Sequence, residues 1–254
     1  MAKKKIIIGN WKMHPSTEKE TEKWFKNVAE SVKGIKNTEI VVCAPFLYLA
    51  KLKKISKKIS LGAQDAFWGN IGPFTGEISP QMLYNIGVKY VILGHSERRA
   101  LGESNADVNK KVKAALEAGL VPVLCVGEGV RDENHSYFNL VKMQLEECLR
   151  GISKNLISKI IIAYEPVWAL SSTANRKDAT PADSQEMVIF IRKILADKFG
   201  PEATRTRIIY GGSANERDAE EFFINGGVDG LLPGKASLDP KKFFEIINIA
   251  EKLS

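Results

Sequence analysis

Three side chains with complementary acid–base chemistry, Lys12, His95 and Glu165, each follow a short run of apolar residues. Such runs are typical of strands buried on both faces, and α/β proteins place functional side chains at the carboxyl ends of those strands. A carboxylate can act as a general base, a neutral imidazole can donate a hydrogen bond, and an ammonium group can stabilise developing negative charge. The set suits abstraction of a proton from a carbon next to a carbonyl group.

Each of these residues also has a purely structural interpretation. A glutamate at the end of a strand is often only solvated, Lys12 is one of 37 basic residues, and His95 could be a loop or capping histidine. If His95 begins a helical turn, the positive end of the helix dipole favours its neutral form. Glu97 is followed by two arginines, and the residue types alone favour a structural ion-pair cluster over a second base.

Two glycine-containing segments indicate a site for an anion. Gly212 and Ser213 follow one predicted strand, and Gly234 and Lys235 follow the next. Glycine lets the backbone approach an anion closely, and these two loops of a barrel commonly bind phosphate. Either segment alone is a weak signal, whereas the pair predicts a phosphate site. The polar segment 169–179 has no strand or helix pattern and is long enough to cover such a site.

Apolar strand segments alternate with helical segments along the whole chain. The predicted strands are residues 5–8, 39–43, 59–64, 90–93, 121–126, 160–164, 206–210 and 229–232, and the predicted helices are 17–33, 46–57, 79–86, 105–118, 136–150, 181–199, 215–225 and 240–252. Strict alternation indicates parallel pairing with right-handed crossovers. We therefore predict an α/β fold, a (β/α)8 barrel forming a single domain over residues 1–254. A doubly wound open sheet is less favoured, because the first strand leads into Asn10-Trp11-Lys12 and not into a glycine-rich dinucleotide loop.

The composition limits the classes of function. The hydrophobic content of 44% supports a full core, and the first apolar run, residues 6–8, is too short for a signal peptide or a membrane span. Three cysteines without metal-type spacing suit a reducing, cytoplasmic setting. The net charge of +7 comes from scattered lysines without interleaved aromatic residues, so we expect no nucleic-acid partner. The sequence has no metal-ligand set and no cofactor motif, and we expect neither a metal nor a cofactor.

Six motifs resemble triosephosphate isomerase. They are N-W-K at 10–12, F-T-G-E at 74–77, G-H-S-E-R-R at 94–99, P-V-L-C-V-G-E at 122–128, Y-E-P-V-W-A at 164–169 and Y-G-G-S at 210–213. They follow the order and spacing of the family and span essentially the whole chain. The resemblance implies an aldose–ketose isomerase of glycolysis and gluconeogenesis. Such an enzyme interconverts dihydroxyacetone phosphate and D-glyceraldehyde 3-phosphate through an enediol or enediolate, without a cofactor.

The resemblance also implies a role for each site residue. Glu165 matches the base, His95 the neutral acid that moves protons on the enediol oxygens, and Lys12 the stabilising cation. Asn10 matches a neighbouring donor to the substrate, and Glu97 matches a carboxylate that supports Lys12. Beside Asn10 and Lys12, the expected substrate- and phosphate-binding positions are Ser171, Gly212, Ser213, Gly234 and Lys235.

The segment Asp65–Ile78 resembles the loop through which the family forms homodimers. It carries Phe67, Trp68, Ile71 and Phe74, which a monomer would leave as an apolar patch. We therefore expect a homodimer through this segment.

The sequence departs from the family at two points that concern phosphate binding. The segment after Trp168 lacks the two glycines usual at its tip and is longer by about three residues, which costs little loop entropy. Lys235 stands where the family usually has a second glycine. Two other functions remain open: a barrel that binds triose phosphate or a partner with poor turnover, and another phosphate-binding barrel such as a sugar-phosphate lyase. The intact Lys12, His95 and Glu165 favour the isomerase.

Overall fold

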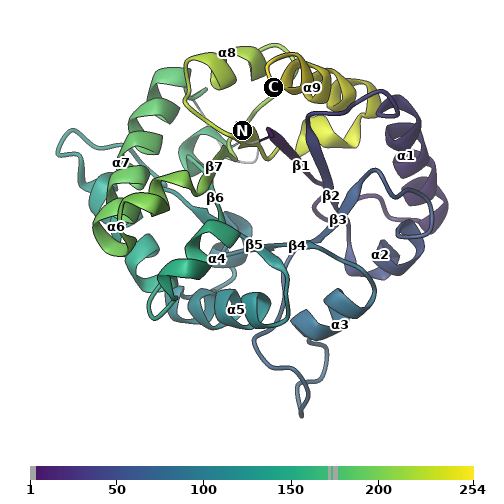
Figure 1. Ribbon diagram of the computed structural model, residues 1–254, viewed down its shortest axis with the longest axis horizontal. Coiled ribbons are helices and arrows are strands. Elements are labelled where there is room, and N and C mark those ends of the chain that lie inside the picture. The colour runs from purple at the N-terminus through teal and green to yellow at the C-terminus, as the bar shows by residue number, and fades with distance from the viewer. Residues whose placement is uncertain (1–3, 171–172, 174–176) are drawn as a thin grey trace.

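Short runs of β-branched and aliphatic residues form a closed barrel of parallel strands in the computed structural model, which describes residues 4–170, 173 and 177–254 (Figure 1). The strands are β1 Ile6–Asn10, β2 Glu39–Cys43, β3 Ser60–Ala63, β4 Tyr90–Leu93, β5 Val121–Val126, β6 Ile161–Tyr164, β7 Arg207–Tyr210 and β8 Gly230–Leu231. Each strand pairs with its neighbours in sequence, and β1 closes the ring against β8. The predicted barrel is confirmed.

The closure between β1 and β8 requires a glycine. Ile6 lies opposite Gly230 and Ile7 opposite Leu231 in the parallel register. A Cβ atom on Gly230 would lie only 2.1 Å from the carbonyl oxygen of Ile6, which is far below van der Waals contact. The close approach of the two backbones at this seam therefore depends on the missing side chain.

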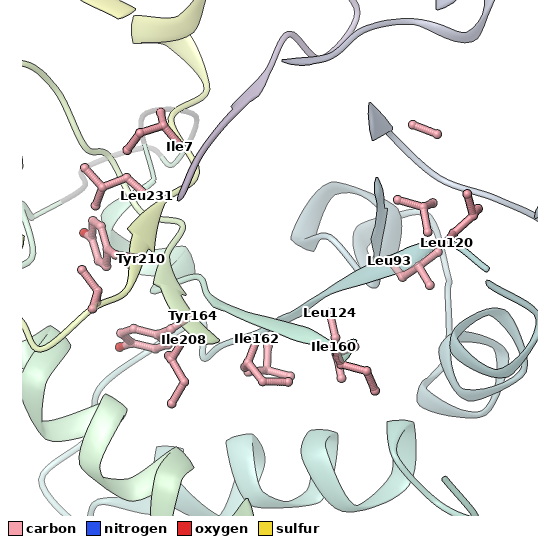
Figure 2. Packing of buried hydrophobic residues seen from close by; sticks show 14 of the residues in the cluster. Ile7, Leu93, Leu120, Leu124, Ile160, Ile162, Tyr164, Ile208, Tyr210 and Leu231 are labelled. Atoms are coloured by element: carbon pink, nitrogen blue, oxygen red, sulfur yellow. The ribbon is translucent and has the colours of Figure 1, made fainter. Parts of the chain in front are cut away.

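Alternate residues of each strand enter two different apolar layers. Ile6 and Ile8 belong to the cluster inside the barrel, together with residues such as Ile92 and Ile209. Ile7 belongs to the larger cluster between strands and helices. In Figure 2, labelled members of this outer layer such as Leu124 and Ile162 are directed from the strands toward the surrounding helices. Because both faces are buried, the strands have no polar face, which explains their continuous apolar sequence.

The helices form an outer ring around the strands (Figure 1). The α-helices are α1 Glu18–Ser31, α2 Phe46–Leu52, α3 Pro80–Asn85, α4 Ser96–Ala100, α5 Asn105–Glu117, α6 Ser136–Cys148, α7 Pro181–Phe199, α8 Ala219–Ile224 and α9 Pro240–Lys252, and the 3-10 helices are η1 Lys154–Lys159, η2 Val167–Ala169, η3 Pro201–Arg205 and η4 Lys235–Leu238. Within the described part of the chain, no helix is both long and apolar enough to cross a membrane.

The predicted helices are present, and three differences have local causes. The helix predicted over 46–57 ends at Leu52, because the N–H groups of Lys54 and Ile55 bond three residues back instead of four. The helix predicted to begin at residue 215 begins at Ala219, after a turn in which Asp218 Oδ1 accepts from the N–H of Asn215. The short helix α4 was not predicted, since its five residues carry no apolar period.

Glu39 anchors an ionic cluster at the amino ends of the strands, opposite to the end where chains of this fold carry their chemistry. Its Oε1 accepts from Lys89 Nζ at 2.8 Å and from the Tyr90 hydroxyl, and its Oε2 accepts from Arg207 Nη1 at 2.8 Å. Burial raises the pKa of Glu39, but the hydrogen bonds from Lys89, Tyr90 and Arg207 outweigh it and lower the pKa from 4.5 to about 2. The ionised carboxylate of Glu39 therefore stabilises the folded barrel.

Replacing Glu39 with glutamine should remove stability in a pH-dependent way. The pKa of Glu39 is lower in the folded state than in the unfolded state, where it is about 4.5. Such a carboxyl group stabilises the folded state fully above pH 4.5, and this contribution is lost as the pH falls through about 2. The free energy of unfolding of Glu39→Gln should lie below that of the parent by at most about 3 kcal/mol at pH 6. Denaturant titrations from pH 6 to pH 3 should show this difference in the free energy of unfolding becoming smaller below pH 4.5.

The matched variant Glu202→Gln, at a side chain that is 80% exposed, should have the same free energy of unfolding as the parent at every pH. A gap that stays constant with pH would contradict the assignment.

Candidate active site

The predicted acid–base residues meet at the carboxyl ends of the strands. Asn10 ends β1 and Lys12 follows it, His95 lies between β4 and α4, and Glu165 follows β6. A pocket at this end is lined by Asn10, Lys12, His95, Leu170, Gly211, Gly212, Ser213, Ala214, Leu232, Gly234 and Lys235. The ring closure brings these residues together from strands that are far apart in sequence.

Lys12 has a left-handed backbone conformation that its neighbours hold in place. Its φ is +52°, an unusual value for a residue with a side chain. Its N–H donates to Asn10 Oδ1 at 3.0 Å, and its carbonyl oxygen accepts from Gln64 Nε2 at 2.8 Å. Gln64 also donates to the carbonyl oxygen of Cys43 at 2.9 Å, so it joins the loop after β1 to β2. The Lys12 ammonium group pairs with Glu97 Oε1 at 2.5 Å.

His95 is the N-cap of α4 and is 7% exposed. Its Nδ1 accepts from the backbone N–H of Glu97 at 3.2 Å. A ring nitrogen that accepts carries no proton, so this hydrogen bond assigns the single ring proton to Nε2 and makes the ring neutral. His95 thus begins a helical turn, as the argument for a neutral ring requires, and Nε2 is left as a donor.

Glu165 is a buried carboxylate with one uncommitted oxygen. The residue is 2% exposed, and its Oε2 accepts from the backbone N–H of Ser96 at 3.0 Å. Its Oε1 lies 3.1 Å from His95 Nε2, but no aligned hydrogen bond from the described residues reaches Oε1. Burial, reinforced by the charge of Glu165 and by a hydrogen bond to its carboxylate, raises the pKa of the adjacent Cys125 thiol, which stays protonated.

Two glycines allow the backbone to enclose Glu165. A Cβ atom on Gly127 would lie 1.8 Å from the carbonyl oxygen of Glu165. A Cβ atom on Gly211 would lie 2.9 Å from the Cγ atom of the same residue. The second contact is with the side chain itself, so Gly211 controls where the carboxylate can lie.

The glycine-containing loops after β7 and β8 present backbone donors to the pocket. Within the described chain, no hydrogen bond uses the N–H groups of Gly212, Gly234 or Lys235. A Cβ atom on Gly234 would lie 3.3 Å from Lys12 Cε, so this loop packs directly against the cationic side chain. Lys235 begins η4, and the residue is exposed to solvent. Free N–H groups next to an ammonium group form an environment suited to an anion.

The segment that could cover the pocket is described only in part. Ser171 and most of the glycine-free tip lie outside the described residues. On its amino-terminal side, Trp168 Nε1 donates to Glu128 Oε1 at 2.8 Å. On its carboxyl-terminal side, Thr180 and Asp183 form a capping box at the start of α7.

The structure adds positions to which sequence reasoning assigned no role. These are Gln64, which holds Lys12, Ser96, which binds Glu165 through its N–H, and Glu128, which accepts from Trp168. Glu128 was visible inside the motif at 122–128, but nothing in its local pattern indicated its partner. Among residues 4–170, 173 and 177–254, no group of three or more histidine, cysteine or acidic side chains is arranged to hold a metal ion.

The comparisons with known proteins agree with one another. A sequence model of the triosephosphate isomerase family matches residues 5–250. Triosephosphate isomerase of Dictyoglomus thermophilum is 42% identical over 250 residues, which cover 96% of this chain and 99% of the relative. Triosephosphate isomerase of Thermoanaerobacter pseudethanolicus is 44% identical over 248 residues, which cover 96% and 98%. The crystal structure of triosephosphate isomerase from Bartonella henselae superimposes with a TM-score of 0.84 at 36% identity, covering 97% of this chain and 98% of that chain.

Adding one methyl group at Gly211 should misplace the carboxylate of Glu165. The Cβ of Gly211→Ala meets Glu165 Cγ at 2.9 Å, so the side chain must move. Misplacement of a reacting group by about 1 Å can cost about 100-fold in rate, and we expect kcat to fall by about 10- to 100-fold. The control Gly129→Ala meets no atom within 4 Å and should leave kcat unchanged. Steady-state kinetics on both variants, with thermal melts to confirm folding, test this. A folded Gly211→Ala enzyme with kcat within twofold of the parent would show that the site tolerates the extra atom.

Proposed function

The chain belongs to the triosephosphate isomerase family and interconverts dihydroxyacetone phosphate and D-glyceraldehyde 3-phosphate in glycolysis and gluconeogenesis, and we propose that Glu165, His95 and Lys12 carry out this reaction. The observation that best supports these roles is the uncommitted Oε1 of a carboxylate that is 2% exposed, 3.1 Å from a neutral imidazole. A base and an acid at that separation can act on adjacent atoms of one small substrate.

Glu165 acts as the general base. Its Oε1 removes a proton from the carbon next to the substrate carbonyl, and the electron pair moves onto the carbonyl oxygen to form an enediolate. Return of the proton to the neighbouring carbon gives the isomeric triose phosphate. The N–H of Ser96 holds the other oxygen at 3.0 Å and orients the carboxylate in the structure without substrate.

His95 and Lys12 act on the oxygens. The Nε2–H of His95 donates to the carbonyl oxygen as negative charge develops there, and the ring then moves a proton between the two enediol oxygens. The Lys12 ammonium group stabilises the same charge, with Asn10 as a neighbouring donor. Glu97 keeps the ammonium group in place through its 2.5 Å contact.

The phosphate of the substrate lies against the loops after β7 and β8. The N–H groups of Gly212, Gly234 and Lys235 are open to an anion, and Ser213 lines the same pocket. Ser171 completes the set expected from the family resemblance. The side chain of Lys235 adds positive charge at the edge of the pocket, which favours encounter with an anionic substrate. We place the protein in the cytoplasm, where glycolysis takes place and where its three buried, unpaired cysteines remain reduced.

Replacing Glu165 with glutamine tests the base. The amide is nearly isosteric but cannot accept a proton, so kcat should fall by about 10²–10⁴-fold, or about 3–5 kcal/mol of barrier. A coupled assay with glyceraldehyde 3-phosphate measures this and also establishes that the parent turns over its substrate. The matched control Glu133→Gln changes an exposed carboxylate in the same way and should keep the parent rate. Turnover close to that of the parent in Glu165→Gln would exclude Glu165 as the base.

We further propose that the chain forms a homodimer through the segment Asp65–Ile78, which projects away from the barrel beside α3 (Figure 1). The side chain of Ile71 is 95% exposed, and Trp68 and Phe74 are 36% and 45% exposed. Phe67 stacks on Trp68 with ring centroids 4.2 Å apart and contacts Phe74 at 4.6 Å, so the segment is packed against itself with an apolar tip. A second copy would bury this tip in a two-fold interface.

Changing Ile71 to aspartate should dissociate the dimer. Multi-angle light scattering at micromolar concentration should give the parent twice the chain mass of 28.1 kDa and the variant a mass close to one chain. The control Ile224→Asp alters a side chain that is 61% exposed on α8 and should stay dimeric. An active, monodisperse monomer in the parent would rule out the proposed assembly.

A further inference from the structure

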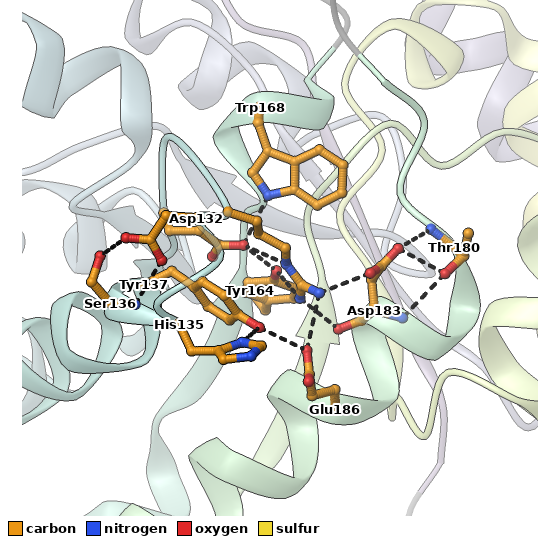
Figure 3. Close-up of polar contacts among 11 residues, drawn as sticks. Asp132, His135, Ser136, Tyr137, Tyr164, Trp168, Thr180, Asp183 and Glu186 are labelled. Atoms are coloured by element: carbon orange, nitrogen blue, oxygen red, sulfur yellow. Dashed lines mark hydrogen bonds and ion pairs between the residues drawn. The ribbon is translucent and has the colours of Figure 1, made fainter.

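The guanidinium group of Arg131, in the segment between β5 and α6, contacts both flanks of the segment 169–179. On the amino-terminal flank it donates from Nη2 to the hydroxyl of Tyr164 at 3.2 Å, and it also donates from Nε to Oε1 of Glu128, which follows β5, at 3.2 Å. On the carboxyl-terminal flank it donates from Nη1 to Asp183 Oδ1 at 2.7 Å and from Nη2 to the Asp183 carbonyl oxygen at 3.0 Å. Figure 3 shows Tyr164, Trp168, Asp183 and Glu186 converging on one point.

Glu128 transmits the amino-terminal contact to the strand end that carries Glu165. It is fully buried, and its Oε1 accepts from Trp168 Nε1 and from the Tyr164 hydroxyl, both at 2.8 Å. Burial and the charge of Glu128 raise the pKa of Tyr164 far above its ordinary value, so this hydroxyl remains a donor. The carbonyl oxygen of Glu128 also accepts from the N–H of Val167 at 2.9 Å. Glu128 thus holds the residues on both sides of Glu165.

Asp183 transmits the carboxyl-terminal contact to the start of α7. While Oδ1 accepts from Arg131, Oδ2 accepts from the N–H and the hydroxyl of Thr180 at 2.8 Å and 2.7 Å. One carboxylate therefore joins the arginine to the residue at which the segment ends. Glu186, one turn further along α7, accepts from Arg131 Nη1 at 3.0 Å.

The charges around Arg131 show that its removal would drive the surrounding carboxylates apart. One guanidinium group faces three carboxylates, those of Glu128 after β5 and of Asp183 and Glu186 on α7. Its side chain is 19% exposed and lies over the Trp168 ring, 5.6 Å from the centroid. Without it, like charges would face one another across the gap, and a buried carboxylate would lose its ionic partner. Attraction between the flanks would become repulsion.

We propose that Arg131 is a positioning residue, which fixes the two flanks of the segment 169–179 relative to each other and so fixes the strand end that carries Glu165. The inference rests on the proposed role of Glu165 as the base. Arg131 does not line the substrate pocket, so its effect should fall on the chemical step and not on substrate affinity.

The kinetics of Arg131→Met and Arg131→Lys test this proposal. We expect kcat of Arg131→Met to fall by about tenfold or more, with KM within about threefold of the parent, because misplacement of the base slows chemistry. Arg131→Lys should recover part of the loss, since an ammonium group can pair with a carboxylate but cannot span both flanks in a fixed geometry. The matched control Arg205→Met removes an arginine that is 73% exposed beside β7 and should retain the parent kcat.

A double-mutant cycle separates positioning from general stability. Asp183→Asn should lower kcat by itself, and Arg131→Met combined with Asp183→Asn should be about as slow as the slower single variant. Each enzyme is assayed at least 20 °C below its own melting temperature. The fluorescence of Trp168, taken as the difference between each protein and its Trp168→Phe counterpart, should change in Arg131→Met before substrate is added.

Three results would overturn the inference. They are a kcat within twofold of the parent despite a lower melting temperature, a KM that rises as much as kcat falls, and additive effects in the cycle. If Arg131→Met does not fold, Arg131→Lys and Asp183→Asn complete the same cycle. An inactive parent would instead refute the proposed function, so the two failures are distinguishable.

Discussion

Holding a charged carboxylate out of water while leaving one of its oxygens without a donor is costly, and much of this end of the barrel serves that arrangement. Glu165 is 2% exposed and receives one backbone hydrogen bond, from Ser96. The rest of its surroundings restrict it by shape, since Gly127 and Gly211 bring backbone against it where no Cβ would fit. An oxygen that no aligned donor from the described residues reaches is available to accept a proton from a substrate. The cost of burying this carboxylate can be sustained only because the parallel strands around it are closed and packed on both faces.

The carboxyl ends of parallel strands provide the geometry that such a site needs. Asn10 and His95 line one pocket although they come from different strands, and Glu165, from a third, lies 3.1 Å from His95. Local backbone devices then set each group: a left-handed turn at Lys12 held by Gln64, and a helix start that leaves His95 neutral. The functional groups lie in the loops, and the strands fix the positions from which those loops begin.

The sequence predicted the fold well because its strands are buried on both faces and its helices are capped by side chains that follow known rules. Continuous apolar runs located the strands, and Thr180 with Asp183 located the start of α7. The strand-end rule placed Lys12, His95 and Glu165 at one end of the barrel, whereas their roles were expected from the family resemblance. Contacts between distant polar side chains were not predicted, since neither the link between Gln64 and Lys12 nor that between Arg131 and Asp183 follows any period or spacing. The short α4 was missed for a related reason, because its five residues carry no apolar period.

The Glu39 cluster lies at the opposite end of the strands from His95, and this separation has an evolutionary consequence. Tyr90 begins β4, which His95 follows after Gly94, and the four residues of this strand span about 13 Å. This exceeds the screening length of about 8–10 Å in physiological salt, so surface charges at one rim are felt only weakly at the other. Substitutions that adapt the barrel to heat or acid can therefore accumulate around Glu39, far from the groups that turn over substrate. In many enzymes stability is gained at the expense of activity, but here stability and activity can be selected almost independently.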